Sequence, residues 1–436
     1  MRSIRARFPV AAGDRGMTLV EVMVAMFVFA IIATAVLASL VQVLATNRES
    51  RAQHVAASLA ASEIELAHDT ADLFTLLDAT RTVTVGGVPY TIARTTAWVS
   101  ASGAAAACGA GGGSLRYKRV HVTVTWPNMP ESALPVRADT VVNPAEHIND
   151  PAKGTVLVSI IDSVGVGVPS ATVSLTATSG GATIAPVSTD SQGCAYFLQV
   201  PPGIYDVSVA KLGHTGILEA TPRQRDVSVQ ASSSTSVSLQ YDLATTLRLT
   251  FAPGTSAPRL PTGMPLSLVT TYGVRSSTLP STTRTQDVTA HPRVNYRVLA
   301  GSVLQANGQE CAAVDPTAWP AGLVGLEQLA EGAATDVAGD PGRVATADVR
   351  MGLITIPTSV TNLRATSVPG RLGDPTCSGH PVLSYGSVTA GTVIAVPYGT
   401  WTLSGTGLGV LLATPASRGQ VLLPGTITLD PREVAP

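Results

Sequence analysis

The sequence predicts an α+β chain: a long N-terminal membrane-spanning helix and a small antiparallel sheet, followed by two β-sandwich domains. Three observations predict it. An apolar run with a single charged residue occupies residues 17–45. Between Met17 and Val85 there is no Gly or Pro, although the 436-residue chain contains 40 Gly and 30 Pro. Beyond about residue 150, short Val- and Thr-rich runs alternate with Gly and Pro, a pattern typical of β-sandwiches.

The apolar run of residues 17–45 is long enough to cross a membrane, because ~20 apolar residues span the ~30 Å hydrocarbon core. Residues 1–16 contain four Arg and one Asp. The positive-inside rule therefore places this segment in the cytoplasm and everything after Asn47 on the outer side. Glu21 is the only charge in the run. A carboxylate at such a position costs about 2.5–3.5 kcal/mol, so Glu21 is expected to have a partner.

Residues Gly16 to Glu21 read Gly-Met-Thr-Leu-Val-Glu, with the small residue before the apolar run. A secretory signal instead has its cleavage site after that run. The arrangement resembles the type IV prepilins, the family of pilins and pseudopilins whose leader is removed on the cytoplasmic side of the membrane. The alternative is a plain signal anchor with a chance Glu.

The resemblance implies roles for three residues. Gly16 would end the leader, residues 1–16, and Met17 would become the N-methylated amino terminus. Glu21 would pair with the amino terminus of a neighbouring subunit during filament assembly. Two features depart from the family pattern, since Phe is commoner than Met at the new terminus and many leaders are shorter.

The helix is expected to continue beyond the membrane, because Gly and Pro, the strongest helix breakers, are absent up to Val85. We expect one helix of roughly 50–60 residues, about 80–90 Å long at 1.5 Å per residue. Its outer half has a weak apolar stripe at helical spacing. The stripe consists of Val55, Leu59, Ser62 and Leu66. In pilins this half of the helix docks on a small sheet.

The small sheet is predicted from alternating Val and polar residues. Its strands are expected at residues 81–85, 88–99, 117–126 and 136–142. Gly86 and Gly87 form the predicted hairpin turn, and the Ala- and Gly-rich residues 101–114 form a loop. The stretch is similar to the sheets of minor pilins and type II secretion pseudopilins. The amphipathic helix and this sheet would together occupy residues 46–144.

Residues 145–153 are predicted to be a linker, and a β-sandwich is expected in residues 154–243. This region contains turn signals at Asp190 and at Val200-Pro-Pro-Gly, where Pro fixes φ and Gly permits positive φ. Their order resembles the transthyretin-like, carboxypeptidase-regulatory-type sandwich. That family is an accessory domain and implies no peptidase activity.

A second sandwich is expected in residues 244–436. Its end echoes Val200-Pro-Pro-Gly with Val396-Pro-Tyr-Gly. This echo predicts a domain of similar design, enlarged by an insertion at about residues 270–387. Loops on a rigid scaffold often carry the residues that recognise a ligand, so we expect the features specific to this protein to lie in the insertion.

Four cysteines are compatible with an oxidising compartment. Cys311 and Cys377 both lie in the expected insertion and are the pair predicted to form a disulfide. Such a bond would close a loop of about 65 residues and contribute ~4 kcal/mol. For Cys108 and Cys194 two possibilities stay open: free thiols, or a bond that joins the pilin head to the first sandwich.

Charge and motifs argue against nucleic-acid binding and catalysis. A net charge of −1 with 13% charged residues leaves no general basic face for nucleic acid. The chain has no His-Glu-x-x-His, Cys-x-x-Cys, P-loop or Gly-x-Ser-x-Gly motif. Its seven His are scattered. We therefore expect no enzyme, no metal and no cofactor.

These features predict a structural, minor type IV pilin-like subunit that is processed by a prepilin peptidase/methyltransferase. Before assembly it would cross the cytoplasmic membrane once, with its N-terminus inside and its C-terminus outside. It would then join other pilin subunits in an extracellular surface filament and display its β-sandwiches for adhesion or interaction with an unknown ligand. The alternatives are a pseudopilin of a type II secretion-like system, a membrane-anchored adhesin that binds a glycan or protein, and an anchored enzyme.

Overall fold

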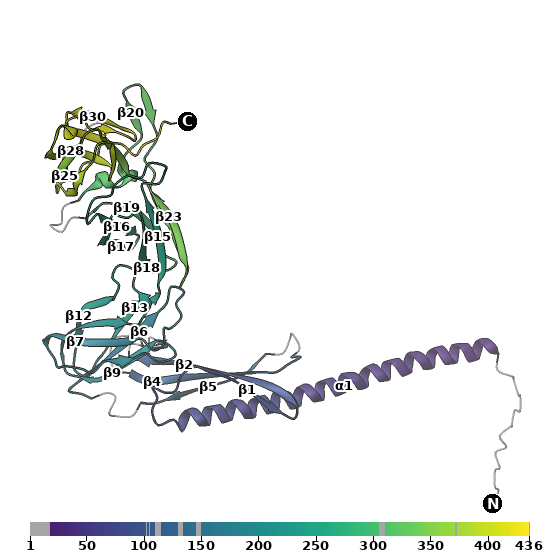
Figure 1. Ribbon diagram of the computed structural model, residues 1–436. Helices are drawn as coiled ribbons and strands as arrows, with labels where there is room; N and C mark the ends of the chain where they lie inside the picture. The colour runs from purple at the N-terminus through teal and green to yellow at the C-terminus, as the bar shows by residue number, and fades with distance from the viewer. Residues whose placement is uncertain are drawn as a thin grey trace, which may run out of the picture. The chain divides into compact units, whose positions relative to one another are not determined.

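The computed structural model shows one long helix followed by a series of β-sheets (Figure 1). It describes residues 18–101, 103, 105–109, 115–129, 134–144, 150–304, 310–370 and 373–435. The chain divides into two compact units. The first takes in residues up to Thr96 and Arg119–Val142, and the second takes in Ala97–Lys118 and the chain from Asn143 onward.

Helix α1, Leu19–His68, is 50 residues long, or about 75 Å at 1.5 Å per residue. Thr18 caps its first turn. The large apolar side chains from Leu19 to Leu44 are all exposed. Only the second half of the helix is covered by other parts of the first unit. As expected from the sequence, a single helix therefore continues well beyond the apolar run.

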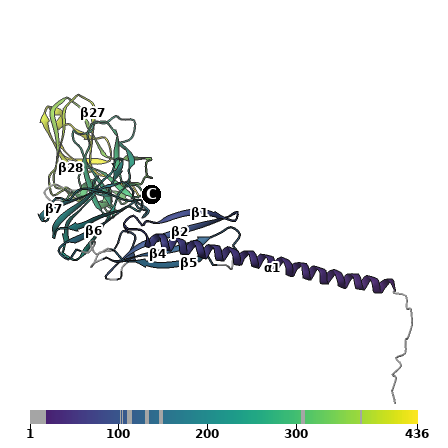
Figure 2. The ribbon, with the colours of Figure 1, turned by 90° about the horizontal axis from the view of Figure 1, so that it is seen from below.

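The second half of α1 lies along a five-stranded sheet with the order β1-β2-β4-β5, in which β3 pairs with β2 (Figures 1 and 2). The strands are β1 (Ala79–Val85), β2 (Val88–Ser100), β3 (Ala105–Ala106), β4 (Leu115–Thr125) and β5 (Val136–Val142). Gly86 and Gly87 turn the β1–β2 hairpin with φ of +58° and +84°. These angles fit a type I′ turn, which glycine adopts without strain.

The buried face of α1 differs from the predicted stripe. The buried residues are Ala56, Ala60, Glu63 and Ala67. Ser62 and Leu66 are instead exposed, and Val55 and Leu59 are only half-buried. The buried face is thus offset by one residue, or about 100° around the helix. The offset arises because small Ala side chains allow the backbone to lie close to the sheet, where two arginines bind Glu63.

The second unit contains a first β-domain with the sheet orders β12-β10-β7-β8 and β13-β6-β9 and the ribbon β11-β14. Its strands are β6 (Gly154–Ile161), β7 (Thr172–Gly180), β8 (Val187–Ser188), β9 (Cys194–Val200), β10 (Gly203–Ala210), β11 (His214–Thr215), β12 (Arg223–Val229), β13 (Ser234–Gln240) and β14 (Asp242–Leu243). Valine side chains dominate the core and surround the buried rings of Phe197 and Tyr205. Strand β13 closes the domain by pairing in parallel with β6.

A middle β-domain follows, with the sheet orders β18-β15-β23 and β17-β16-β19-β22. Its strands are β15 (Thr245–Phe251), β16 (Pro265–Thr270), β17 (Gly273–Thr278), β18 (Thr285–Ala290), β19 (Tyr296–Ala300), β22 (Thr335–Val337) and β23 (Val344–Val349). The two sheets enclose a hydrophobic cluster that includes Phe251, Met264 and Tyr296.

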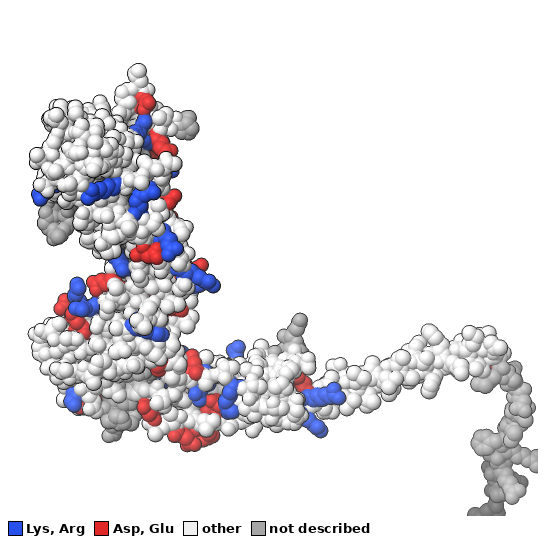
Figure 3. All heavy atoms as spheres, viewed as in Figure 1, with Lys and Arg blue, Asp and Glu red and all other residues white. Residues whose placement is uncertain are grey.

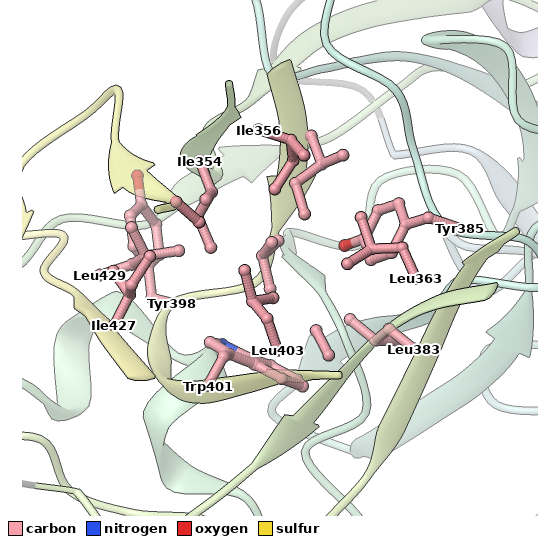
Figure 4. Close-up of a cluster of buried hydrophobic side chains, with 14 of the residues drawn as sticks. Ile354, Ile356, Leu363, Leu383, Tyr385, Tyr398, Trp401, Leu403, Ile427 and Leu429 are labelled. Carbon is pink, nitrogen blue, oxygen red and sulfur yellow. The ribbon is translucent and has the colours of Figure 1, made fainter. Parts of the chain in front are cut away.

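The last β-domain has the sheet orders β27-β24-β29 and β26-β25-β28-β31-β30. Its strands are β24 (Gly352–Ile356), β25 (Val360–Ser367), β26 (Val382–Val388), β27 (Thr392–Val396), β28 (Gly399–Thr406), β29 (Thr414–Pro415), β30 (Gly419–Leu423) and β31 (Thr426–Leu429). Trp401 lies in its core with Ile354 and Leu403 (Figure 4). Shorter elements accompany these two domains: η2 (Ala312–Val314), η3 (Pro316–Ala318), η4 (Leu408–Val410), β20 (Gly322–Val324) and β21 (Glu327–Leu329).

The described part of residues 244–436 differs in one respect from the expected single, enlarged sandwich. The described part of this region forms two separate hydrophobic cores. The predicted insertion at residues 270–387 supplies strands to both of them. The reason is a parallel pairing of β15 with β23, which sets Thr246 opposite Val344 and adds the third strand to the sheet β18-β15-β23. Such a long-range parallel pairing has no local sequence signal.

Two disulfides cross-link the second unit. Cys311 is joined to Cys377 within the core of the last β-domain. Cys108 is joined to Cys194, so the segment between β2 and β4 is bonded to strand β9. Both cysteines of the second bond are buried. The sequence left open whether Cys108 and Cys194 are free thiols or form a disulfide, and in the structure they form a disulfide.

Candidate assembly site at the N-terminal helix

The three residues singled out by the sequence lie at or just before the start of α1. Gly16 and Met17 fall outside the described residues, which begin at Thr18. Glu21 lies in the first turn of the helix and is exposed to solvent. In the described part of the chain, Glu21 forms no ion pair.

Thr18 and Glu21 have a further, local role that the sequence reasoning missed. The Thr18 hydroxyl accepts a 3.3 Å hydrogen bond from the backbone N–H of Glu21. The Thr18 carbonyl also accepts from the N–H groups of Glu21 and Val22, at 3.0 and 3.2 Å. The signal was present in the sequence, since Thr-x-x-Glu is the pattern of a capping box. The helix N-terminus also carries a partial positive charge, which favours a carboxylate there.

The first half of α1 is an uncovered apolar surface. Seventeen large apolar side chains would each gain about 1.5–3 kcal/mol on transfer from water to an apolar environment. Of the described elements, α1 is the helix long and apolar enough to span a membrane. This property follows from the length and composition of the helix. Its apolar surface could be covered by lipid or, equally well, by the apolar faces of other helices.

The second half of α1 is fixed to its sheet by a buried carboxylate. The side chain of Glu63 is 4% exposed and binds two arginines from the β1–β2 hairpin. Arg81 Nη2 lies 2.8 Å from Glu63 Oε2, and Arg94 Nη1 lies 2.8 Å from the other oxygen, Oε1. Arg94 also donates from Nε to the carbonyl oxygen of Leu77 at 3.0 Å. Two guanidinium groups on one desolvated carboxylate couple the helix firmly to the sheet.

The described residues contain no group of three or more His, Cys, Asp or Glu side chains placed to hold a metal ion. Buried carboxylates have local partners instead. Asp430 binds Arg432 through two hydrogen bonds of 3.0 and 2.8 Å. Asp374 accepts a 2.6 Å hydrogen bond from the Thr400 hydroxyl. Burial raises the pKa of Asp374 above its ordinary value.

Residues 12–37 match a family model described as the prokaryotic N-terminal methylation motif. The matched segment contains Gly16, Met17 and Glu21. The chain therefore carries a prepilin-type N-terminus, in agreement with the resemblance noted in the sequence. Such a motif implies, in general terms, cleavage by a prepilin peptidase, membrane anchoring by the apolar helix and assembly with other pilin subunits. Comparison with curated proteins gives no match.

Among solved structures, the Bacillus anthracis TIE protein covers 83% of this chain and 72% of its own, with 11% identity and a TM-score of 0.20. A streptococcal ancillary pilin covers 53% of this chain and 76% of its own, with 10% identity and a TM-score of 0.20. The match to a minor pilin of Streptococcus agalactiae covers 45% of this chain and 94% of that pilin, with 12% identity and a TM-score of 0.20.

Proposed function

We propose that this protein is a minor type IV pilin-like subunit with a structural, non-catalytic role. It is cleaved between Gly16 and Met17, methylated at Met17 and packed into a surface filament by α1. The observation that carries the proposal is the methylation motif at residues 12–37. The uncovered apolar half of α1 supports it, because a filament core of packed helices would bury that surface.

The topology follows from the charges around the apolar run. Four Arg precede it and hold residues 1–16 in the cytoplasm. The sheet and the β-domains then lie on the outer side of the cytoplasmic membrane. Their two disulfides suit this side, because disulfides persist in oxidising compartments.

Assembly exchanges lipid contacts for helix contacts. In the membrane, Glu21 is a carboxylate in a largely apolar environment, which is costly without a partner. The methylated amino group of a neighbouring subunit supplies an opposite charge at the same depth. This pairing selects the register at which the incoming helix stops, while the apolar residues Val22–Leu44 pack against neighbouring helices.

The three β-cores favour a minor subunit over the repeating one. A major subunit is present at every step of the filament, so each copy of this large second unit would have to fit around the shaft. A subunit present in few copies avoids that crowding. The β-domains then serve as a displayed surface for adhesion or for contacts with other proteins.

Mass spectrometry of the native protein from sheared filaments and from membranes tests the processing step. We expect a chain that starts at methylated Met17, and a Gly16→Val variant that retains residues 1–16. A native chain that starts at Met1, or that is cut after residue 45, would contradict the proposal. Recovery in the sheared fraction indicates a pilus, whereas confinement to the envelope indicates a secretion pseudopilus.

Replacing Glu21 tests the assembly step separately from processing. Glu21→Gln should be cleaved normally, but its amount in sheared filaments should fall at least about tenfold. Loss of a charge pair worth ~1.4 kcal/mol already lowers the equilibrium constant for incorporation tenfold. Glu65→Gln is the matched control, since Glu65 is exposed on the same helix beyond the apolar run. Equal incorporation of both variants would remove Glu21 from the assembly mechanism.

A further inference from the structure

A groove lies between α1 and the end of its sheet, within the first compact unit. Its volume is about 880 Å³, within the range of sites that hold small molecules. Helix residues from Gln42 to Val55 form one wall. The turn of the β1–β2 hairpin and the residues that follow β4 form the other. All of these elements belong to one compact unit, so the groove is a property of that unit.

The groove begins where the membrane-spanning part of α1 ends. Counted from Leu19, ~20 helical residues cross the ~30 Å hydrocarbon core, which places its outer edge near Leu40. Gln42 is the first helix residue in the groove. With the topology proposed above, the groove therefore opens at the depth of the lipid headgroups in the outer leaflet.

Two arginines line the groove, and neither pairs with a carboxylate of the described residues. Arg48 and Arg51 are exposed and form no ion pair within the described residues. Glu49 lies between them in sequence, but its carboxylate accepts from Trp126 Nε1 at 3.5 Å and from Gln53 at 3.4 Å. Figure 3 shows basic side chains on α1 beside the end of the sheet. The guanidinium group matches phosphate oxygens in a bidentate geometry.

Two aromatic residues lie on the opposite wall, among aliphatic and turn residues. Tyr90 and Trp126 are 3% and 7% exposed and line the groove. Their ring centroids are 6.3 Å apart. Tyr and Trp rings are enriched at membrane interfaces because they have an apolar body and a polar edge. The groove is thus lined by two arginines and Glu49 on the helix and by the small exposed parts of two aromatic rings on the other side. Two guanidinium groups beside aromatic rings suit a charged headgroup joined to an apolar tail.

We propose that this groove binds the headgroup of an anionic phospholipid of the cytoplasmic membrane. Arg48 and Arg51 bind the phosphate, and Tyr90 and Trp126 contact the glycerol and the first part of the acyl chains. The bound lipid fixes the depth of α1 and holds the sheet at the membrane surface before assembly. This inference rests on the membrane topology of the proposed function.

Photo-crosslinking of the mature, full-length chain in phosphatidylcholine vesicles tests the inference. The vesicles contain a minor fraction of a photoreactive phosphatidylglycerol or, in parallel, of a photoreactive phosphatidylcholine. We expect phosphatidylglycerol adducts on peptides that line the groove. Labelling at limiting lipid should fall about fivefold for each arginine removed in Arg48→Gln and Arg51→Gln. The control is Arg137→Gln, at an exposed arginine of β5 outside the groove, which should label like the unaltered protein.

A photoreactive amino acid at position 88, in the groove wall, identifies the occupant independently. A phospholipid adduct supports the inference, and an adduct with a second copy of the chain overturns it. Equal labelling by the two lipids, or by the arginine variants and the control, also overturns it while leaving the proposed function intact. A mature chain that does not insert into vesicles at all overturns the proposed function itself.

Discussion

The indole Nε1 of Trp401 donates a 2.9 Å hydrogen bond to the carbonyl oxygen of Pro397, four residues earlier. The first β-domain contains the same contact, because the Tyr205 hydroxyl donates to the carbonyl oxygen of Pro201 at 2.8 Å. Both rings are almost fully buried. The repeated sequence Val-Pro-x-Gly-x-aromatic therefore corresponds to a repeated local structure. In each copy a buried aromatic ring fixes the turn before the next strand, β10 or β28.

Removing the hydroxyl donor of Tyr205 is expected to destabilise the first β-domain, and removing the indole donor of Trp401 is expected to destabilise the last one. Tyr205→Phe keeps the ring but leaves the Pro201 carbonyl and the Ala182 N–H without their shared partner, at a cost of about 1–3 kcal/mol. Trp401→Phe also loses ring volume and should cost at least as much. Urea unfolding provides the measurement. Tyr272→Phe, at an exposed ring, is the control and should lie within about 0.5 kcal/mol of the unaltered protein. A similar value for Tyr205→Phe would show that the contact does not stabilise the turn.

The Glu63 carboxylate is expected to hold the helix on the sheet. Glu63→Gln leaves Arg81 and Arg94 without their shared anion, and breaking a buried pair costs about 3 kcal/mol. Hydrogen exchange of residues 56–68 should therefore accelerate. Glu65→Gln alters an exposed carboxylate of the same helix, and exchange should stay as in the unaltered protein. Equal protection in the two variants would mean that the alanine face alone holds the helix.

The N-terminal features could be predicted because they are encoded in consecutive residues. The apolar run, the Gly16-to-Glu21 motif and the absence of Gly and Pro each involve neighbours in sequence. The same holds for the Gly86-Gly87 turn, which forms the hairpin between β1 and β2. The capping contact between Thr18 and Glu21 was equally local and could have been read from its spacing.

The remaining features depend on residues far apart in the chain. The buried face of α1 follows Ala56 and Ala60, which carry little hydrophobic signal. Charge pairing with Arg81 and Arg94 turns Glu63 inward, against what its residue type suggests. The parallel pairing of β15 with β23 separates two domains that the sequence presented as one. The bond between Cys108 and Cys194 likewise links segments 86 residues apart.

The Cys108–Cys194 disulfide is expected to stabilise the second unit substantially. It closes a loop of 86 residues, for which loop entropy gives about 4.5 kcal/mol. The double variant Cys108→Ser, Cys194→Ser should unfold at a clearly lower urea concentration under oxidising conditions. Reductant should lower the midpoint of the unaltered protein further, because it also opens Cys311–Cys377. A double variant with an unchanged midpoint would show that the bond adds no stability.

Stability should depend on pH through Asp374. Burial raises the pKa of this carboxyl, so the native state binds its proton at a higher pH than the unfolded chain. The residue therefore contributes stability below the ordinary Asp pKa of ~3.9 and loses it as the pH rises through the raised native value. Asp374→Asn removes this titration. Relative to the unaltered protein, the variant should gain stability as the pH rises from about 4 to 7.

Asp287 provides the opposite case for the same measurement. A hydrogen bond from Arg248 lowers the pKa of the Asp287 carboxyl, so its contribution is present above ~3.9 and is lost as the pH falls. Asp287→Asn should therefore lose stability, relative to the unaltered protein, as the pH rises. Urea unfolding at several pH values measures both trends. Trends of the same sign in the two variants would contradict the assignment of opposite pKa shifts.

The close approach of α1 to its sheet should depend on the small size of Ala60. Its side chain is 1% exposed, so Ala60→Leu must insert three extra carbons where the helix meets the sheet. Overpacking of this kind costs about 1–3 kcal/mol. Ala57→Leu makes the same chemical change on the exposed face and should be nearly neutral. Hydrogen exchange of β5, which contacts α1, should rise in Ala60→Leu only. Equal exchange in both variants would mean that helix and sheet are packed loosely enough to accept a larger residue.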